Sequence, residues 1–245
     1  MSTGTTTTRR VYLGVDLSSR YARVPRPNDA CELVSNGDGT LHALFWQWRW
    51  PAGDLASNLG PLLERIHGAR LVMIDGPQGL ARPGAAVRES ERLCATPGRT
   101  GDRLPDLTRP YSGFLRSSIE LYAALHGRGV PLSVVGAAGG VHEFYPGGAW
   151  PRLAGRRLSR KTSEAGRRQR TALLRRFGVH LDPTGEPLSH DRLDACLGAV
   201  LAAAADGAIA GLQVAPVGCA LWRDDGGILR EGPIVMPAVV PGDDG

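Results

Sequence analysis

Three aspartates stand where apolar segments end or begin, positions at which a carboxylate is costly to bury. Asp16 follows Val-Tyr-Leu-Gly-Val, Asp75 follows Leu-Val-Met-Ile, and Asp194 lies within His-Asp-Arg-Leu-Asp-Ala. A carboxylate at the rim of a buried strand loses hydration unless a cation or hydrogen-bond donors compensate it. Because the three residues are far apart in the chain, we expect the fold to bring them together around a divalent metal.

A fourth acid adjoins this set. Asp191 and Asp194 are three residues apart and share one face of an expected helix. Three or four converging carboxylates suit Mg²⁺ or Mn²⁺, hard cations that prefer oxygen ligands. Two such ions about 4 Å apart activate a water and stabilise the leaving oxygen in phosphodiester cleavage. The alternative is that Asp16 and Asp75 close turns and Asp191 caps a helix, but the combination favours a metal site.

The order of expected elements predicts an α/β domain with a mixed sheet. Strands are expected over Arg10–Leu17, Thr40–Trp50, Arg70–Ile74, Val130–Val135, Val141–Tyr145, Val214–Trp222 and Gly227–Met236, with a hairpin turn at Ser35–Gly39. Helices are expected over Asp54–His67, Ser112–His126, Ala165–Phe177 and Asp191–Ala205. In this order an antiparallel meander precedes a helix and then parallel strands, so Asp16 and Asp75 are expected side by side. Trp46, Trp48 and Trp50 share one strand face, which we expect to pack under a helix rather than stack on bases.

Composition limits the function classes. With 245 residues and 42% hydrophobic residues, the chain suits one domain over residues 11–237, with polar tails at 1–10 and 238–245. Residues 79–108 are rich in Arg, Gly and Pro and predict a long insertion. No apolar run reaches about 18 residues, so no membrane span is expected. Four scattered cysteines without a CxxC pair indicate reduced thiols, a cytoplasmic location and no zinc site.

A basic segment offers a partner for phosphates. Ten basic residues and one acid lie between Arg152 and Arg176, although the whole chain carries only +5. Within the segment, Lys161, Arg167 and Arg170 are the candidate phosphate contacts, and nucleic acid is the expected partner. The open alternative is a solvated, arginine-rich helix face.

Four motifs resemble a known family. They are Gly14-Val15-Asp16, Ile74-Asp75-Gly76-Pro77-Gln78-Gly79-Leu80, Glu143-Phe144-Tyr145-Pro146 and Asp191-Arg192-Leu193-Asp194-Ala195. From about Val11 to Pro237 the chain is similar to an uncharacterised bacterial and archaeal family described as predicted ribonuclease H-like nucleases. The last motif also resembles the final helix of Holliday-junction resolvases.

The resemblance implies a ribonuclease H-like fold: a mixed sheet of antiparallel meander and parallel strands flanked by helices. It implies an active site on Asp16, Asp75 and Asp194, with Asp191 and Glu143 as further candidate metal ligands. Glu143 could equally orient an arginine.

The leading hypothesis is therefore a metal-dependent nuclease that hydrolyses nucleic acid by a two-metal mechanism. The second is an enzyme of the same fold acting on a small nucleotide or phosphorylated substrate. The third is a non-catalytic nucleic-acid-binding module. A shared fold does not choose among them.

Overall fold

The structure is a computed structural model that describes residues 9–36, 40–133, 138–181 and 187–238. Over these residues the protein is an α/β fold with a mixed eight-stranded sheet and a separate two-stranded sheet. In sheet order, the large sheet contains β6 (Val179–His180), β3 (Leu41–Trp48), β2 (Asn28–Ser35), β1 (Arg10–Asp16), β4 (Leu71–Asp75), β5 (Gly140–Phe144), β10 (Ile234–Pro237) and β7 (Val214–Val217). The small sheet pairs β8 (Leu221–Arg223) with β9 (Leu229–Glu231). The turn expected at 37–39, most of the N-terminal tail and nearly all of the C-terminal tail lie outside the described residues.

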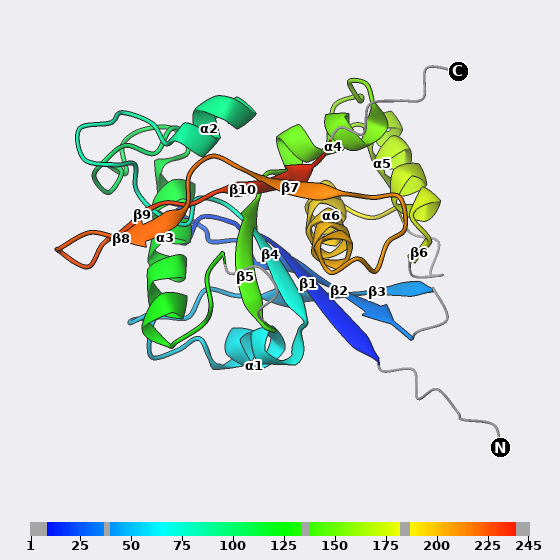
Figure 1. The fold of residues 1–245 in the computed structure, drawn as a ribbon, viewed down its shortest axis with the longest axis horizontal. Coiled ribbons are helices and arrows are strands. Elements are labelled where there is room, and N and C mark those ends of the chain that lie inside the picture. The colour runs from blue at the N-terminus through cyan, green and yellow to red at the C-terminus, as the bar shows by residue number, and fades with distance from the viewer. Residues whose placement is uncertain (1–8, 37–39, 134–137, 182–186, 239–245) are drawn as a thin grey trace.

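Helices cover both faces of the large sheet (Figure 1). They are α1 (Gly60–Gly68), α2 (Glu89–Cys94), α3 (Ser112–Gly127), α4 (Pro146–Ala154), α5 (Glu164–Arg176) and α6 (His190–Ala205). One core layer lies between the sheet and α1 and α3, and the other between the sheet and α4, α5 and α6.

The antiparallel meander and the parallel strands are as expected. β1 pairs antiparallel with β2, and β2 with β3, whereas β4 runs parallel to both β1 and β5. Strand β4 is continuously apolar because both of its faces are covered: Val72 and Ile74 pack toward α1 and α3, and Met73 packs toward α6. Since side chains alternate along a strand, the next residue, Asp75, points to the α6 face.

Helix α6 is buried almost throughout and lies against β1, β2 and β4. Its small side chains, with Gly198 among them, let the backbone approach the sheet closely. A Cβ on Gly14 of β1 would overlap the carbonyl oxygen of Ala195, so only glycine permits this contact. The helix is thus fixed tightly beside the end of β1.

The tryptophan face packs as expected. Trp48 is buried in the core layer that contains α1, and Trp46 and Trp50 pack against that layer. The guanidinium carbon of Arg65, from α1, lies 5.1 Å above the centre of the Trp46 ring. These side chains serve the sheet–helix contact.

Some expected boundaries were wrong. Helix α1 begins at Gly60 rather than Asp54, because the Asp54 carboxylate accepts hydrogen bonds from the Ser57 backbone and hydroxyl and closes a turn. Pro61 then occupies the first turn of the helix, where its missing N–H costs nothing. In place of the strand expected over Val130–Val135, the described residues there show an isolated bridge at Leu132.

The two strands expected near the C-terminus are each divided into two. Val214–Trp222 breaks at Gly218, with φ 100°, and Gly227–Met236 breaks at Glu231 and Gly232, with φ 52° and 104°. These left-handed residues turn the chain out of the large sheet, and the pieces β8 and β9 pair separately. Helix α4, with Pro146 in its first turn, was not expected at all.

Candidate functional site

Asp16 and Asp75 end two neighbouring parallel strands. Val15 pairs with Ile74 in the β1–β4 register, so the two aspartates follow at the same level. Both strands alternate so that these carboxylates point to the α6 face, and the two side chains line one cavity. This side-by-side placement was expected from the order of the elements together with the acids that end them.

Asp194 reaches the same place from α6. The helix starts with Ser189 as its N-cap, whose hydroxyl accepts a hydrogen bond from the Arg192 N–H. The Asp194 side chain is 1% exposed and both of its oxygens are engaged. Oδ1 accepts a 2.6 Å hydrogen bond from Trp150 Nε1, and Oδ2 lies 2.9 Å from Lys161 Nζ. Two donors therefore fix this carboxylate.

The three acids repel one another in a buried place. Burial, followed by the charges of Asp75 and Asp194, holds the pKa of Asp16 well above its usual value. Burial, followed by the charge of Asp194, raises the pKa of Asp75 to about 8. Lys161 opposes both shifts. The cluster thus carries more negative charge than its surroundings neutralise, and an additional cation would relieve it.

Lys161 is the only lysine in the chain, and it lies at the acids. It belongs to the segment between α4 and α5. Burial lowers its pKa, but the charges of Asp194, Asp16 and Asp191 outweigh this effect and the pKa is raised. Its side chain remains 48% exposed, so the ammonium contacts both Asp194 and solvent.

Asp191 lies at the rim of the cluster. Its Oδ1 is 2.6 Å from His190 Nδ1, and its Oδ2 is 3.4 Å from an Arg26 guanidinium nitrogen. Asp191 belongs to the first turn of α6 and Ser189 is the cap, so the alternative of an Asp191 N-cap was wrong. The charge of Asp191 contributes to the raised pKa of Asp16.

Glu143 binds an arginine, which is one of the two roles open to it. In the β4–β5 register it pairs with Ile74, not with Asp75, and therefore points to the opposite sheet face from the aspartates. Arg88 binds both carboxylate oxygens at 2.5 and 2.8 Å, and the Gln78 N–H adds a third donor at 3.0 Å. Burial raises the pKa of Glu143 to about 7, although Arg88 lowers it. Glu143 nevertheless lines the same cavity as the four aspartates, and its charge contributes to the raised pKa of Asp75.

Arg88 is the partner of Glu143, a pairing that the sequence did not indicate. It is fully buried in the insertion, and its Nε lies 3.3 Å from Glu91 in addition to the Glu143 contacts. Glu91 in turn accepts hydrogen bonds from the Thr100 N–H and hydroxyl. The signal in the sequence was the Arg–Glu pair three residues apart, which is ordinary on a helix surface.

The basic segment divides into buried and exposed parts. Arg170 donates to the carbonyl oxygens of Ser159 and Gly166, and its guanidinium carbon lies 5.5 Å above the Trp150 ring. Burial lowers its pKa. Arg167 donates to the Thr162 carbonyl and lies at the surface, away from the acids.

A second cavity of about 610 Å³ follows the exposed face of α5. The arginines that line it are Arg167, Arg168, Arg175 and Arg176. Glu164 is the acid among its lining residues. The arrangement gives this surface a strong local positive charge.

The acids open into a cavity of about 510 Å³. The acids that line it are Asp16, Asp75, Glu91, Glu143, Asp191 and Asp194, and Lys161, Arg26 and Arg170 also line it. Another part of the lining is aromatic and proline-rich. It includes Tyr111, Phe114, Tyr145, Pro77, Pro97 and Pro146.

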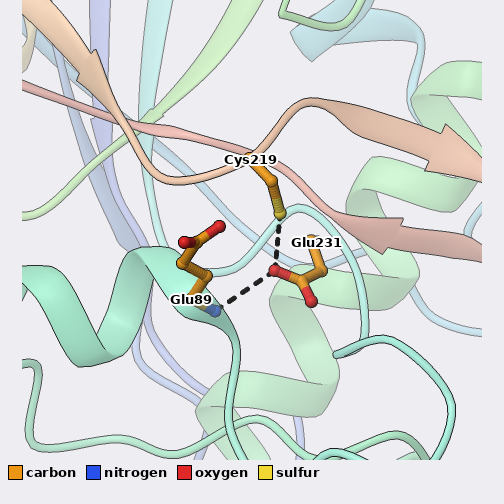
Figure 2. Close-up of side chains that lie close together, drawn as sticks. All are labelled: Glu89, Cys219 and Glu231. Atoms are coloured by element: carbon orange, nitrogen blue, oxygen red, sulfur yellow. Dashed lines mark hydrogen bonds between the residues drawn. The ribbon is translucent and has the colours of Figure 1, made fainter.

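A separate group of potential ligands lies under β9 (Figure 2). The side chains of Glu89, Cys219 and Glu231 place one ligand atom each within 4.8 Å of one another. The Glu231 carboxylate accepts hydrogen bonds from the Arg82 and Glu89 N–H groups and from the Cys219 thiol. Burial, followed by the hydrogen bond to Glu231, raises the pKa of Cys219 to about 12, so the thiol stays protonated. These hydrogen bonds explain why the three side chains lie together: they connect α2 to the C-terminal strands.

Comparison with known sequences assigns a family. A protein family described as "Protein of unknown function (DUF429)" matches residues 14–216, which include all four motifs and every candidate acid. The chain therefore belongs to the DUF429 family. No curated protein and no solved structure matches it. In the described residues, no helix has both the length and the apolar character to cross a membrane.

Proposed function

We propose that the protein is a metal-dependent phosphodiesterase of ribonuclease H-like fold that hydrolyses nucleic acid. The fold assignment is supported by an antiparallel meander followed by parallel strands, with the meander's first strand beside β4. The convergence of Asp16, Asp75 and Asp194 in one cavity carries the functional proposal.

The residue types of the cavity suit a hard divalent cation, and among the described residues the aspartates as a set lie farther apart than the 4.8 Å that joins Glu89, Cys219 and Glu231. The candidate donors are carboxylate oxygens, which Mg²⁺ and Mn²⁺ prefer. The raised pKa values of Asp16 and Asp75 indicate uncompensated negative charge, which a bound divalent cation would offset. Asp16, Asp75 and Asp194 would hold the metal, with Asp191 as a further ligand and Glu143 in a supporting role. A bound cation would supply water activation and stabilisation of the leaving oxygen.

The chain's own residues orient the reaction. Trp150 holds Asp194 through Oδ1, and Arg170 stacks on the Trp150 ring, so neither the acid nor its donor can turn freely. Lys161 and Arg26 line the cavity with exposed cationic ends and would bind phosphate oxygens. Arg88 fixes the Glu143 carboxylate through both of its oxygens and joins the insertion to β5.

The arginine surface of α5 supports a polymeric substrate. Its exposed arginines lie outside the acid cavity and continue the positive charge beyond Lys161 along the helix. A single nucleotide in the cavity would not need this surface, whereas the backbone of a nucleic acid would contact several phosphates along it. We assign Arg167 to this outer role, and Arg170 to orienting Trp150.

A panel of single- and double-stranded DNA and RNA, incubated with Mg²⁺ or Mn²⁺, tests the proposal. The wild-type protein is expected to cleave at least one member, and Asp16→Asn and Asp75→Asn are expected to abolish cleavage while the far-ultraviolet circular dichroism stays unchanged. Asp54→Asn is the matched control, since Asp54 closes a surface turn. An inert wild-type protein, or full cleavage by Asp75→Asn, would contradict the proposal.

The size of the cavity favours a second candidate, hydrolysis of a small nucleotide or phosphorylated substrate. A volume of about 510 Å³ is within the range of small-ligand pockets, roughly 300–1,000 Å³. Hydrolysis of mononucleotides, together with no cleavage of any DNA or RNA in the panel, would favour this second candidate.

A further inference from the structure

We infer that the cavity beside the aspartates contains a binding site for one unpaired nucleobase, with Tyr111, Phe114 and Tyr145 as its stacking surfaces. The inference rests on the proposed phosphodiester hydrolysis, because it names the part of the substrate that this cavity selects. It follows from three aromatic positions, the dimensions of the cavity and the chemistry of stacking.

Phe114 lies directly beside the end of β4. A Cβ built on Gly76, the residue after Asp75, would lie 3.1 Å from Phe114 Cζ. Gly76 has a φ of 124°, which glycine adopts at no steric cost. The Phe114 ring of α3 therefore contacts the residue that directly follows the candidate catalytic Asp75.

Tyr145 approaches from the other side, at the end of β5. Its side chain lines the same cavity as Asp75 and Tyr111. A Cβ on Gly148 would be 3.0 Å from Tyr145 Cδ1, so glycine at that position leaves space for the ring. The two tyrosines and Phe114 therefore border the same space as Asp75.

Tyr111 stands at the entrance. It is 59% exposed and has a φ of 63°, a left-handed conformation that is uncommon for a residue with a side chain. The Tyr111 ring is not buried in the core and lines the cavity, where it is free to contact a ligand. Positions with such backbone geometry concentrate at ligand-binding sites.

The dimensions select an unpaired base. About 510 Å³ accommodates one ligand of nucleotide size, not a segment of double helix. A base within a duplex has both of its faces covered by neighbouring bases, whereas an unpaired base offers a free π-face to aromatic side chains. Lys161 and Arg26, which line the same cavity, supply cationic donors for the adjoining phosphate. The preferred substrate is thus a single strand, an end or a bulge.

Fluorescent 2-aminopurine tests the site, since stacking on an aromatic ring quenches its emission. The probe is placed in a short single-stranded oligonucleotide, or paired within a hairpin stem, and titrated into the Asp75→Asn protein with Mg²⁺ present. We expect quenching and tighter binding for the unpaired probe. Tyr111→Ala is expected to weaken that binding by about 5- to 150-fold, the equivalent of one base–aromatic stack. Tyr111→Phe keeps the ring and is expected to bind as the parent does.

Trp222→Ala is the matched control, because Trp222 is 42% exposed on β8 and lines a different cavity. Equal binding of paired and unpaired probes, or no effect of Tyr111→Ala, would overturn the base site. Cleavage assays on the wild-type protein separate the two proposals. Cleavage that is indifferent to Tyr111 removes the base site alone, whereas Tyr111-dependent quenching without any cleavage removes the hydrolase alone.

Discussion

Gly14 and Gly198 face each other where α6 crosses β1: a Cβ built on Gly198 would lie 3.2 Å from the Gly14 Cα. Two residues beyond Gly14 is Asp16, and one turn before Gly198 is Asp194. The two glycines therefore set the approach of two candidate catalytic acids from different elements. This contact makes the geometry of the site depend on the packing of the core.

Substitution of Gly14 by alanine is expected to destabilise the protein by about 1–3 kcal/mol, because the new methyl group overlaps the α6 backbone. Cleavage should fall as well, since α6 can accept the methyl only by moving Asp194. Gly127→Ala at the end of α3 is the control, as its Cβ would meet nothing within 4 Å. Urea unfolding measures both variants, and wild-type stability in Gly14→Ala would refute the close contact.

The stability of the metal-free protein is expected to fall as the pH rises from about 4 to about 8. The folded state raises the pKa of Asp75 from 3.8 to about 8, so in this window the native state binds more protons than the unfolded state and loses stability as they dissociate. Asp75→Asn should flatten the dependence and be more stable at pH 8 by on the order of a few kcal/mol. Thermal melts across this range test the sign.

Addition of Mg²⁺ at pH 8 provides the companion measurement. A ligand that binds only the folded state stabilises it in proportion to the logarithm of its concentration. The wild-type protein should gain melting temperature with Mg²⁺ or Mn²⁺, and Asp75→Asn much less. Equal gains in both proteins would argue against Asp75 as a ligand.

Replacement of Lys161 by methionine is expected to strengthen divalent-metal binding and to weaken substrate binding. The ammonium at 2.9 Å from Asp194 competes with any cation for that carboxylate, so its removal frees an oxygen and leaves more negative charge. Isothermal titration with Mn²⁺ gives the first effect, and the Michaelis constant the second. Arg10→Met, which loses an ion pair to Asp206 elsewhere, should change neither.

Loss of Arg88 is expected to cost about 3–5 kcal/mol, since Arg88→Met leaves Glu143 and Glu91 buried without their partner. The double variant Arg88→Met/Glu143→Gln should recover part of this loss. Chemical denaturation of the two single variants and the double variant gives the coupling energy. A purely additive cycle would contradict the pairing.

Neutralisation of the α5 surface is expected to weaken nucleic-acid binding without changing metal affinity. For each arginine among Arg167, Arg168 and Arg175 that contacts a phosphate, a change to Gln should reduce the slope of log affinity against log salt by about 0.7–0.9. Arg128→Gln on the far end of α3 is the control. An unchanged slope would show that this face is only solvated.

The sequence predicted correctly those strands and helices whose apolar periodicity and flanking residues indicate the same element. The apolar runs that end in Asp16 and Asp75 predicted two central strands, and the order of elements placed these strands side by side, as the β1–β4 register confirms. Helix α6 was predicted within one residue at its start because Asp191 and Asp194 introduce a long alanine-rich stretch.

What the sequence could not supply depends on long-range contacts and on backbone conformation. Glu143 was left with two roles because strand alternation decides its direction only once its partner in β4 is known. Trp150 was missed as a donor to Asp194, since nothing local links residues 44 positions apart. The strand predicted over Gly227–Met236 was too long, because the chain breaks at Glu231. A left-handed φ is uncommon for any residue other than glycine, so nothing in the sequence indicated this break.

The sole lysine of the chain also makes the protein chemically simple. An acylating or reductively methylating reagent has two kinds of primary amine to attack: the α-amino group and the Lys161 side chain. Because the ion pair with Asp194 raises the pKa of that side chain, the unreactive ammonium form predominates while the pair persists. A cation that displaces Lys161 from Asp194 would unmask it. The rate at which this one residue is labelled therefore reports, by mass spectrometry alone, whether the acidic site is filled.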